Sequence, residues 1–416
     1  MNVWILNHYA IPPTQNGGTR HFSLAKYLAK KGHKVTIFAN NFSHFSLKKI
    51  AEPSYISGVP EIFDLVAFVW IPSISYKGNS LKRLLNMLIY MMRVLRGKYR
   101  LNMDIPDIII GSSPHPFAVF AAVKLAKRYK VPFVYEIRDI WPETLLSLNK
   151  VSKYHPITYL FSRIEQYAFK KATHVITIVP LVASYMKNKG YHNTPVTVIP
   201  NFIDLALLPL DVKPIQKSKL TVMYAGNHGL TNNLDTVIKA ARELESEGLN
   251  ENIEIVLIGS GPEKPYLKEL TNEYKISMVK FLDPVPKDKI YTILKNADVF
   301  LLPLMDSVVF KWGVNPNKLF DYLAIGRPII YSVSSSNNIV SQHGLGISIP
   351  ASNYMELTRA IKKMANMQYE QCLEIGVKAR KLVEECYNAE KLALQLQKIL
   401  QQSINVFCEK VVLGKI

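Results

Sequence analysis

The sequence predicts two successive α/β lobes, each built on a parallel sheet whose two faces are covered by helices. Short apolar strands alternate with amphipathic helices through the first half of the chain, and the pattern restarts at residue 219 with KLTVMYAGNHG. Such alternation is typical of parallel sheets. A Pro-rich segment without strong periodicity, residues 200–219, separates the two series. The chain has 416 residues, of which 48% are hydrophobic, enough for two large cores.

The first lobe opens with a strand, a helix and a second strand. Residues 2–6 are an apolar run, residues 20–32 have apolar residues at helical spacing, and residues 33–40 are rich in β-branched residues. A Pro- and Gly-rich loop, residues 7–19, joins the first strand to the helix. Further strands are expected within residues 107–113, 131–139, 174–179 and 195–200.

The second lobe repeats the alternation. A strand with a Gly-containing loop is expected at residues 219–229, followed by a helix at residues 232–248. More strands are expected within residues 252–261, 278–284, 297–304, 327–332 and 346–350, and a long helix within residues 389–407. We therefore expect a first lobe at residues 1–200, a second lobe at residues 201–385, and a C-terminal helix at residues 386–416 that packs back on the first lobe.

The composition favours a reducing compartment and an anionic partner. Three cysteines, at positions 372, 386 and 408, are too few for a disulfide framework. The formal net charge of +19 suits a phosphorylated substrate, an anionic membrane or a nucleic acid, although solubility alone is the simpler explanation. The start MNVWILNHYA lacks a basic segment and a cleavage site, and no run reaches about 18 apolar residues. We therefore expect no signal peptide and no transmembrane helix.

One stretch near the end of the chain predicts a nucleotide site. In NPNKLFDYLAIGRPII, residues 315–330, Lys318 lies at the start of a predicted helix, and Asp321 follows three residues later on the same face. A cation over a helix N-terminus suits an anion such as phosphate. A carboxylate one turn deeper suits a pair of ribose hydroxyls. An exposed helix carboxylate without a ligand is the alternative for Asp321.

Four stretches carry a resemblance to a known family. They are NHYAIPPTQNGGTRH at the start, YEIRDIWPE midway, YAGNHG at the second lobe, and NPNKLFDYLAIGRPII near the end. Over nearly its whole length the chain resembles the GT-B glycosyltransferases, most closely glycosyltransferase family 4. Within that family it is similar to bacterial O-antigen and capsule enzymes, including N-acetylfucosamine transferases. The resemblance implies an α/β fold of the GT-B type: two Rossmann-like lobes with parallel sheets, an interlobe cleft and a C-terminal helix.

In the first lobe the resemblance implies three catalytic candidates, His115, Asp139 and Glu143. His115 follows a strand, where ligands of open α/β sheets bind, and an imidazole can bond a sugar hydroxyl. A capping histidine, or a salt bridge that uses Asp139, is the structural alternative. The glycine pair Gly17 and Gly18 lies where a loop enters a helix, which lets backbone N–H groups approach the donor diphosphate. A tight turn is the alternative for this pair.

In the second lobe the resemblance implies a donor site after the first strand. Gly226 lies there, but the run that begins at Asn227 has no Arg or Lys where family members often carry a basic pair. We therefore assign the diphosphate charge to Lys318 and Lys311. The next strand ends at Gly259 and Gly261, which suit close backbone approach to a uracil or phosphate. An ordinary turn between strand and helix is the alternative for those two glycines.

The helix of the last motif departs from the family pattern. Family members commonly carry two glutamates separated by seven residues; the second is matched by Asp321, whereas the first falls at Gly313. Backbone N–H groups of residues 313–317 are expected to replace the missing contact to the sugar. The complete expected donor set comprises Gly17, Gly18, Gly226, Asn227, Gly259, Gly261, Lys311, Asn317, Lys318, Leu319 and Asp321.

The sequence favours a metal-independent reaction and contact with a membrane surface. No D-x-D triplet occurs, so helix dipole and lysine are expected to stabilise the leaving UDP, without metal or cofactor. Residues 80–100 are predicted to form an apolar helix with basic flanks, too short to span a bilayer but suited to an anionic surface. Its candidate acceptor or membrane contacts are Arg93, Arg96 and Arg100. A packed helix with a basic rim is the alternative.

Together these features predict a glycosyltransferase, retaining by family expectation. The expected donor is a UDP-sugar such as UDP-N-acetylfucosamine, and the expected acceptor is an undecaprenyl-diphosphate-linked saccharide of O-antigen or capsule synthesis. The expected location is the cytoplasmic face of the bacterial inner membrane, with no nucleic-acid partner. A sugar-nucleotide epimerase of the same fold would need no acceptor. A non-catalytic nucleotide-sugar-binding scaffold is the third hypothesis, motivated by Gly313.

Overall fold

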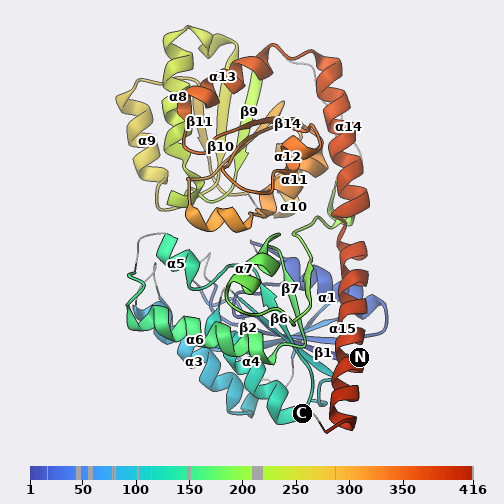
Figure 1. The fold of residues 1–416 in the computed structure, drawn as a ribbon. Helices are drawn as coiled ribbons and strands as arrows, with labels where there is room; N and C mark the ends of the chain where they lie inside the picture. Colours follow the sequence, from blue (N-terminus) through green and yellow to red (C-terminus); the bar gives the residue numbers. More distant parts are fainter. Residues whose placement is uncertain are drawn as a thin grey trace. The chain divides into compact units, whose positions relative to one another are not determined.

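The computed structural model contains two compact units. It describes the whole chain except residues 16, 44–47, 55–59, 77, 79–80, 101–102, 114, 148–150, 209–218, 286 and 415–416, and the side chains of residues 287–288. The first unit comprises Met1–Pro200 and Ala389–Ile416, and the second comprises Asn201–Asn388 (Figure 1). The predicted class, two α/β lobes with parallel sheets and a C-terminal helix, is confirmed.

The sheet of the first unit has the strand order β3-β4-β2-β1-β5-β6-β7-β8. All neighbours pair in parallel except β3, which runs antiparallel to β4 at the edge. The strands are β1 (Asn2–Leu6), β2 (Lys34–Asn40), β3 (Glu61–Phe63), β4 (Val66–Ile71), β5 (Ile108–Ser112), β6 (Phe133–Ile137), β7 (His174–Thr177) and β8 (Val196–Val198).

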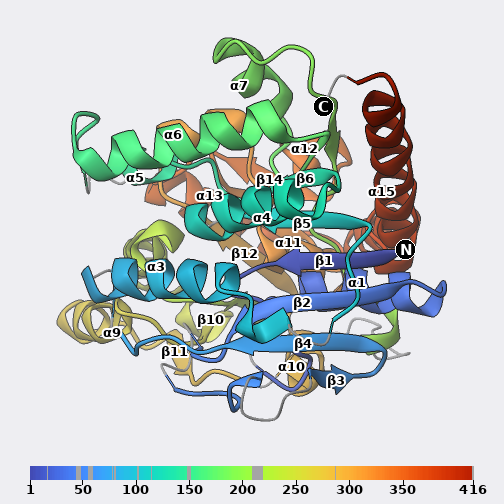
Figure 2. The same cartoon turned by 90° about the horizontal axis from the view of Figure 1, so that it is seen from below.

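Helices cover both faces of this sheet, as right-handed connections between parallel strands require. One layer holds α1 (Arg20–Lys30) and the C-terminal helix α15 (Ala389–Val412), which pack together. In the other layer α4 (Pro116–Tyr129) packs against α3 (Leu81–Leu95) and α6 (Pro156–Lys171) (Figure 2). Two shorter helices, α5 (Glu143–Ser147) and α7 (Val182–Asn188), complete the described helices of the unit.

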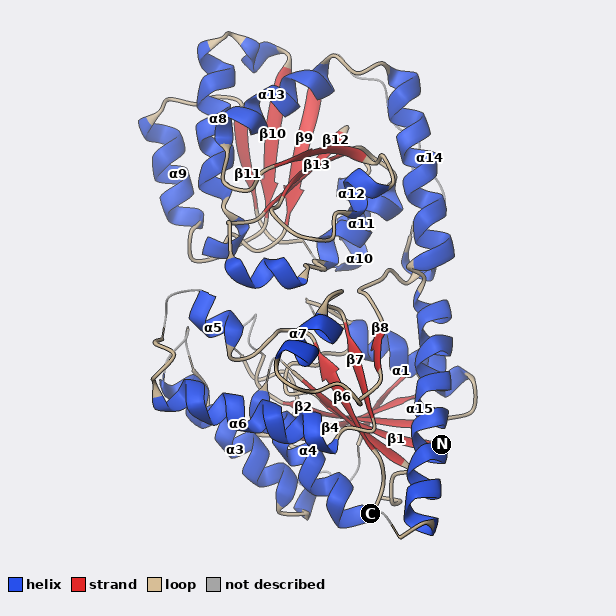
Figure 3. Ribbon diagram, viewed as in Figure 1, coloured by secondary structure: helices blue, strands red, loops and turns tan. Residues whose placement is uncertain are grey.

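The second unit is built on an all-parallel sheet of order β11-β10-β9-β12-β13-β14. Its strands are β9 (Leu220–Ala225), β10 (Ile253–Ile258), β11 (Val279–Leu282), β12 (Val299–Pro303), β13 (Ile329–Ser332) and β14 (Gly346–Ile349). Its helices are α8 (Leu234–Ser246), α9 (Lys264–Glu273), α10 (Lys287–Leu294), α11 (Asn317–Ile325), α12 (Ile339–Gln342), α13 (Tyr354–Ala365) and α14 (Tyr369–Cys386) (Figure 3).

Two hydrophobic clusters flank this second sheet. One joins it to α10, α11 and α14, and the other joins it to α8, α9 and α13. Near-continuous apolar strands such as IEIVLI are buried on both faces, as expected of a parallel sheet. Because α14 runs to Cys386, the expected C-terminal helix of residues 386–416 starts three residues later than predicted, at Ala389. In the part of the chain that the structure describes, no helix combines the length and the hydropathy needed to cross a membrane.

The contact between α15 and the first unit predicts a matched pair of stability effects. Leu396 is 1% exposed, whereas Leu394 on the same helix is 38% exposed. Replacing Leu396 with Ala should lower the free energy of unfolding of the first unit by about 2–5 kcal/mol, because it opens a cavity. The same change at Leu394 should cost less than about 1 kcal/mol. Urea titration monitored in the first unit measures both; equal costs would contradict the packing of this helix.

Candidate functional site

The strand order of each sheet reverses at one place, and candidate residues gather there. In the first unit the chain proceeds from β1 to β2 on one side, and β5 lies on the other side of β1. In the second unit, β9 is followed by β10 on one side and flanked by β12 on the other. Ligands of open parallel sheets bind at such reversal points, beyond the carboxyl ends of the strands. The site residues are described below for each unit separately.

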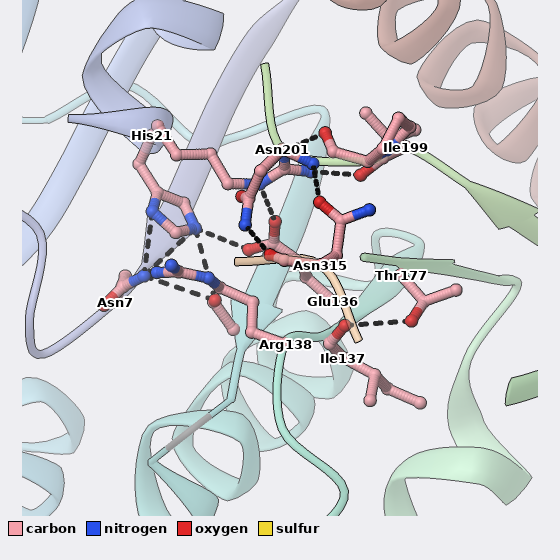
Figure 4. A network of polar contacts seen from close by, with 12 residues as sticks. Asn7, His21, Glu136, Ile137, Arg138, Thr177, Ile199, Asn201 and Asn315 are labelled. Carbon is pink, nitrogen blue, oxygen red and sulfur yellow. Dashed lines mark hydrogen bonds and ion pairs between the residues drawn. The ribbon is translucent and has the colours of Figure 1, made fainter. Parts of the chain in front are cut away.

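A buried carboxylate, Glu136, organises this edge of the first unit (Figure 4). It lies in β6, and its two oxygens bind two side chains from the first turn of α1. Arg20 Nε donates to Oε1 at 3.1 Å, and His21 Nε2 lies 2.5 Å from Oε2. Arg20 also donates to the carbonyl oxygens of Ile199 and Pro200, at 2.8 and 2.6 Å. The start of α1 is thereby tied both to β6 and to the last residues before the second unit.

The same cluster reaches the ends of two more strands. The side-chain amide of Asn7, after β1, lies 3.0 Å from a ring nitrogen of His21 and donates to the Ser112 hydroxyl of β5 at 3.2 Å. Burial alone would raise the pKa of the Glu136 carboxyl, but its contacts with His21 and Arg20 hold that pKa well below its usual range. The carboxylate therefore stays ionised inside the unit.

The expected glycine pair lies just before this cluster. Gly17 and Gly18 are half-buried and lead into α1, and Gly17 has a φ of +140° that L side chains rarely adopt. The N-cap residue Thr19 makes no side-chain hydrogen bond that caps α1, and the first turn of α1 carries no acidic residue. These features suit an anion, and the contact of this helix start with a diphosphate stays a prediction.

His115 caps α4 and is fully buried. Its Nδ1 accepts the N–H of Ala118 at 2.8 Å, and its ring stacks on His8 with the centroids 4.4 Å apart. Burial, then the neighbouring His8, lowers the pKa of His115 well below its usual range, so the ring is neutral. Its Nε2 has no hydrogen-bond partner among the residues that the structure describes. The structure therefore shows the capping alternative, and the contact of Nε2 with a sugar hydroxyl stays a prediction.

The other two catalytic candidates lie on the loop after β6 but have different surroundings. The Ser113 hydroxyl accepts the N–H of Asp139 at 3.3 Å, which ties this loop to the one that leads to His115. The Asp139 side chain is exposed. Glu143 instead starts α5 and pairs with Lys189 Nζ at 3.3 Å; the same amino group binds the buried Glu165 at 3.2 Å. Ser113 thus links the loop of Asp139 to the loop that leads to His115, and Glu143 lies in an ion-pair cluster with α6 and α7.

In the second unit the expected glycines bring two loops into backbone contact. A Cβ on Gly259 would lie 1.9 Å from the carbonyl oxygen of Gly226, and one on Gly261 would lie 2.3 Å from that of His228. These loops follow β9 and β10, so protein backbone, rather than a uracil or phosphate, accounts for both glycines. Asn227 accepts a hydrogen bond from the Tyr224 hydroxyl through its carbonyl oxygen at 2.7 Å.

The loop after β9 supplies no positive charge. Burial, then the neighbouring Lys264, lowers the pKa of His228 to about 4, so this imidazole is neutral at physiological pH. It cannot substitute for the basic pair that family members often carry at this point. The cation of this edge must come from another element.

Lys318, in the first turn of α11, supplies that cation. Its Nζ donates to the Tyr224 hydroxyl at 2.6 Å and to Asn232 Oδ1 at 2.7 Å, and it lies 4.1 Å from the Tyr224 ring centroid. An ideal Cβ on Gly226 would lie 3.1 Å from this amino group. These contacts are with neutral groups, and burial alone lowers the pKa of Lys318 to about 7. The loop after β9 and the start of α11 thus meet around an amino group whose charge these partners do not neutralise.

The other candidates on α11 differ in what they can contribute. Asp321 Oδ1 accepts a hydrogen bond from the hydroxyl of Tyr291 in α10 at 2.7 Å. Lys318 instead bonds Tyr224 and Asn232, so this contact of Asp321 is separate from those of Lys318. Asn317 is exposed at the first position of the helix. Leu319 is 1% exposed within the core, and its N–H already bonds the carbonyl of Pro316 at 3.1 Å. Neither its side chain nor its N–H is available to a donor.

The loop that contains Gly313 is held by the protein itself. The N–H of Gly313 bonds the carbonyl of Phe310 at 2.9 Å, and the N–H of Val314 bonds Asn337 Oδ1 at 2.8 Å. These two amides therefore cannot replace the missing glutamate, which corrects the expectation for the first half of residues 313–317. Lys311 is exposed nearby, and it lines a hollow of about 440 Å³ together with Asp306, Ser307, Val308 and Ser334 to Ser336.

The expected membrane helix is shorter than predicted, and one of its arginines is buried. Residue 80 lies outside the described residues, α3 ends at Leu95, and a separate 3₁₀ turn holds Lys98–Arg100. Arg100 is 6% exposed and donates to the Tyr129 hydroxyl at 2.5 Å, so its expected membrane contact is wrong. Arg93 is half-buried and donates to a loop carbonyl, whereas Arg96 is exposed.

Several polar residues of these sites were not identified from the sequence. Tyr224, Asn232 and Tyr291 hold the two charged residues of α11, and Arg20 and His21 hold Glu136. One signal was present for the last pair: Arg20 and His21 follow the glycine pair after a single residue, Thr19, at the start of a predicted helix. The tyrosines carried no comparable signal, because an aromatic residue in a strand or helix is ordinarily part of the core.

Two family models match successive parts of the chain. Residues 16–207 match "Glycosyltransferase Family 4", and residues 210–382 match "Glycosyl transferases group 1". The chain is 27% identical over 237 residues to WcaI of Escherichia coli K12 and 22% identical over 239 residues to WcaL of the same strain, both named as colanic acid biosynthesis glycosyltransferases. The alignments cover 53% and 57% of this chain and 56% and 58% of those proteins, so the chain spans little more than half the length of these relatives.

Solved structures of glycosyltransferases share the fold. Sucrose-phosphate synthase of Thermosynechococcus elongatus aligns with a TM-score of 0.77 at 15% identity, covering 97% of this chain and 99% of that one. HepE of Anabaena, solved in complex with UDP-glucose, aligns with a TM-score of 0.67 at 14% identity, covering 97% and 100%. WaaG, involved in lipopolysaccharide biosynthesis, aligns with a TM-score of 0.66 at 15% identity, covering 94% and 98%.

The Glu136 cluster predicts a large and pH-dependent stability effect. Glu136→Gln leaves Arg20 and His21 without their carboxylate and should destabilise the first unit by about 3–5 kcal/mol. Because the folded pKa of Glu136 is depressed, its contribution is present above its unfolded pKa and is lost as pH falls below that value. Urea unfolding at pH 7 and pH 4 should therefore show a smaller difference at pH 4. The matched control, Glu143→Gln, removes a partly exposed pair and should cost less than about 1 kcal/mol.

The buried amino group of Lys318 predicts a change of the opposite sign. Lys318→Met should raise the free energy of unfolding of the second unit at pH 7 by about 1–3 kcal/mol, because it removes a desolvated cation. The folded pKa is about 7 and the unfolded value is 10.5, so wild-type stability should rise with pH between these values. The variant should lack this rise. Thermal melts from pH 6.5 to 10 measure it; parallel curves would contradict the shifted pKa.

Proposed function

Because the chain belongs to the GT-B glycosyltransferases through both of its matched domains, we propose that it transfers a sugar from a nucleotide-sugar donor to a saccharide acceptor in the synthesis of a bacterial surface polysaccharide. The observation that carries this proposal is Lys318: a cation among neutral partners, at a helix start, beside the loop after β9 where the strand order reverses. The names of the curated relatives, from colanic acid biosynthesis, support the surface polysaccharide.

The donor that best suits the second unit is a UDP-sugar. A structural relative, HepE, is solved with UDP-glucose, which supports a uridine nucleotide. In this proposal the diphosphate lies against Lys318 and the start of α11, where charge and helix dipole favour an anion. Asp321, oriented by the hydroxyl of Tyr291, accepts hydrogen bonds from the ribose hydroxyls. Lys311 faces the hollow beside Gly313 and is assigned to the donor as a second cation.

The first unit is assigned to the acceptor and to the transferred sugar. The Nε2 atom of His115 is directed to a sugar hydroxyl, and the exposed carboxylate of Asp139 contacts the acceptor. Glu143 orders α5 through Lys189 and shapes the site from a distance. The proposed sugar is an N-acetylated aminodeoxyhexose such as N-acetylfucosamine, and the proposed acceptor is an undecaprenyl-diphosphate-linked saccharide. A lipid-linked acceptor requires work at the inner face of the plasma membrane, as a peripheral protein.

The charge arrangement explains how the chain could assist transfer. As the bond between sugar and diphosphate breaks, negative charge grows on the leaving UDP. Lys318 and the amides at the start of α11 are in place before this charge develops, so they stabilise the transition state more than the ground state. The same cation is desolvated by its surroundings, which lowers the stability of the second unit; a cost of this kind is typical of functional sites.

One assay separates this function from its two rivals. Purified protein is incubated with a panel of UDP-sugars, with and without the lipid fraction of bacterial membranes, and UDP release and labelled lipid are measured. A transferase releases UDP and labels lipid only when the acceptor is present. An epimerase acts on the UDP-sugar without acceptor, and a scaffold binds UDP but releases none from any sugar.

The assignment of Lys318 predicts a pH-dependent affinity for UDP. Lys318→Ala should weaken UDP binding at pH 6.5 by about 1.5–3 kcal/mol, the contribution of a hydrogen bond to a charged group. Because the diphosphate favours the protonated amine, wild-type affinity should fall as pH rises above about 7. Lys318→Arg stays charged and should lose this pH dependence. Isothermal titration calorimetry at pH 6.5, 7.5 and 8.5 measures all three proteins; unchanged affinity in a folded Ala variant would remove Lys318 from the site.

The proposed transfer should proceed without a divalent metal. The sequence has no D-x-D triplet, and the cation proposed to meet the diphosphate is an amino group. Activity is measured on protein treated exhaustively with EDTA, with magnesium or manganese added back. Transfer should continue at an unchanged rate after chelation. A loss of activity that either metal restores would contradict the assignment of the leaving-group charge to Lys318, Lys311 and the start of α11.

A further inference from the structure

The layer formed by α3, α4 and α6 has a one-sided charge. These three helices, all of whose residues are described, carry nine basic residues and a single acidic one, Glu165. Glu165 is 4% exposed and binds the hydroxyl of Tyr185 at 2.8 Å and Lys189 at 3.2 Å. The outer surface of the three helices therefore presents no carboxylate of their own. The exposed basic side chains include Lys82 on α3, Lys124, Lys127 and Arg128 on α4, and Arg163 and Lys170 on α6.

Large apolar side chains are exposed at one end of the same layer. Leu81 is 80% exposed and Leu85 47% in the first turns of α3, whereas Tyr159 is 67% and Leu160 44% exposed in the first turn of α6. Tyr154, just before α6, is 83% exposed. All three helices connect parallel strands, so they run antiparallel to the strands and start at the same edge of the sheet. This is the edge that carries His115 and Asp139.

The exposed residues are additional to a complete inner face. The inner side of α3 consists of its fully buried residues, Asn86, Met87, Tyr90 and Val94. Beside it, the half-buried Leu84, Leu88 and Met91 pack on a cluster that contains Met87 and Phe117. The view that the apolar residues of α3 are buried in the first unit is thus correct for one side of the helix only. The outward side combines apolar residues and cations, a composition suited to a membrane interface.

We propose that this surface, which we call the docking face and define as the outward side of α3, α4 and α6, binds the surface of an anionic lipid bilayer. Its apolar end enters the headgroup region, where tyrosine and leucine are favoured, and its basic side chains meet lipid phosphates. The inference rests on the proposed function, because a lipid-linked acceptor would then reach the sheet edge that carries His115 and Asp139. It extends the sequence-based hypothesis of one membrane helix to three.

Charge and polarity distinguish the bilayer from other occupants. A second copy of the docking face would bring two strongly basic surfaces together without a carboxylate from these helices to neutralise either. A nucleic acid would match the basic side chains but would leave the leucines at the end of the face uncovered. An anionic bilayer accommodates both features at once, because its surface is charged and its boundary is apolar.

Vesicle sedimentation tests the docking face directly. The full-length protein is mixed with phosphatidylcholine vesicles, either pure or containing phosphatidylglycerol, and the bound fraction is measured after centrifugation. The charge variant is Lys82→Glu, Lys127→Glu and Arg163→Glu, and the apolar variant is Tyr159→Ser and Leu160→Ser. Matched controls lie on the second unit: Lys268→Glu, Lys363→Glu and Lys378→Glu, and, for the apolar pair, Tyr266→Ser and Leu282→Ser. Each control has the same change in net charge as its test variant, and the apolar control also has the same residue types.

We expect wild-type protein to sediment with the phosphatidylglycerol vesicles and at least tenfold more weakly with phosphatidylcholine alone. The charge variant should bind the anionic vesicles at least about tenfold more weakly and the apolar variant several-fold more weakly, while both controls stay within about twofold of wild type. If the test and control variants lost vesicle binding equally, the loss would reflect net charge rather than the docking face, and the proposal would be overturned. A wild type that stays in the supernatant would overturn it, and so would a dimer in solution that the test variants dissociate.

UDP affinity, measured on the same preparations, separates this inference from the proposed function. Variants of the docking face should bind UDP as the wild type does, which also shows that they are folded. Wild-type protein that binds UDP but no vesicles would refute the docking face and leave the donor site in place. Wild-type protein that binds vesicles but no nucleotide would refute the donor assignment instead.

Discussion

One buried charge, the carboxylate of Glu136, sets the geometry of the first unit at the carboxyl ends of its strands. An ionised group inside a protein is tolerated only when partners surround it, and Arg20 and His21 provide them from the first turn of α1. The position of α1, and with it the glycine pair before it, depends on this contact. In the second unit the desolvated cation is Lys318, and its hydrogen-bond partners Tyr224 and Asn232 are neutral. Glu136 thus has a cation, Arg20, among its partners, whereas these two partners of Lys318 carry no charge.

Much of the fold could be predicted, because buried strands and amphipathic helices have distinct hydrophobic periodicities in the sequence. The strand at residues 252–261 and the helix at residues 232–248 were found within a few residues of β10 and α8. The strands β3 and β4 were not predicted. A three-residue edge strand has too little periodicity to detect, and VAFVWI is a short apolar run that periodicity alone cannot distinguish from buried helix. The packing of the C-terminal helix on the first unit was expected without a local signal, because the periodicity of a helix does not identify the element it packs against.

Site residues could be predicted only where the signal lies within a short stretch of sequence. Lys318 was identified because a cation at a helix start is informative by itself, but its partner Tyr224 lies 94 residues away in the chain. Arg100 was assigned to a membrane because its neighbours are basic, and only the folded structure shows its guanidinium buried against Tyr129. Glycines carry the same ambiguity: Gly259 marks a close approach, and the sequence cannot say whether a ligand or another loop approaches.

The chain order of the two units has a consequence for synthesis on the ribosome. Helix α15, which packs on α1, is made only after residues 201–388 have been translated. At about 5–20 residues per second, the first unit waits on the order of ten to forty seconds for its last helix. During that time the face of α1 that α15 will cover is exposed to solvent. The second unit, whose chain is continuous, can fold in the interval, so the unit that begins first is the one completed last.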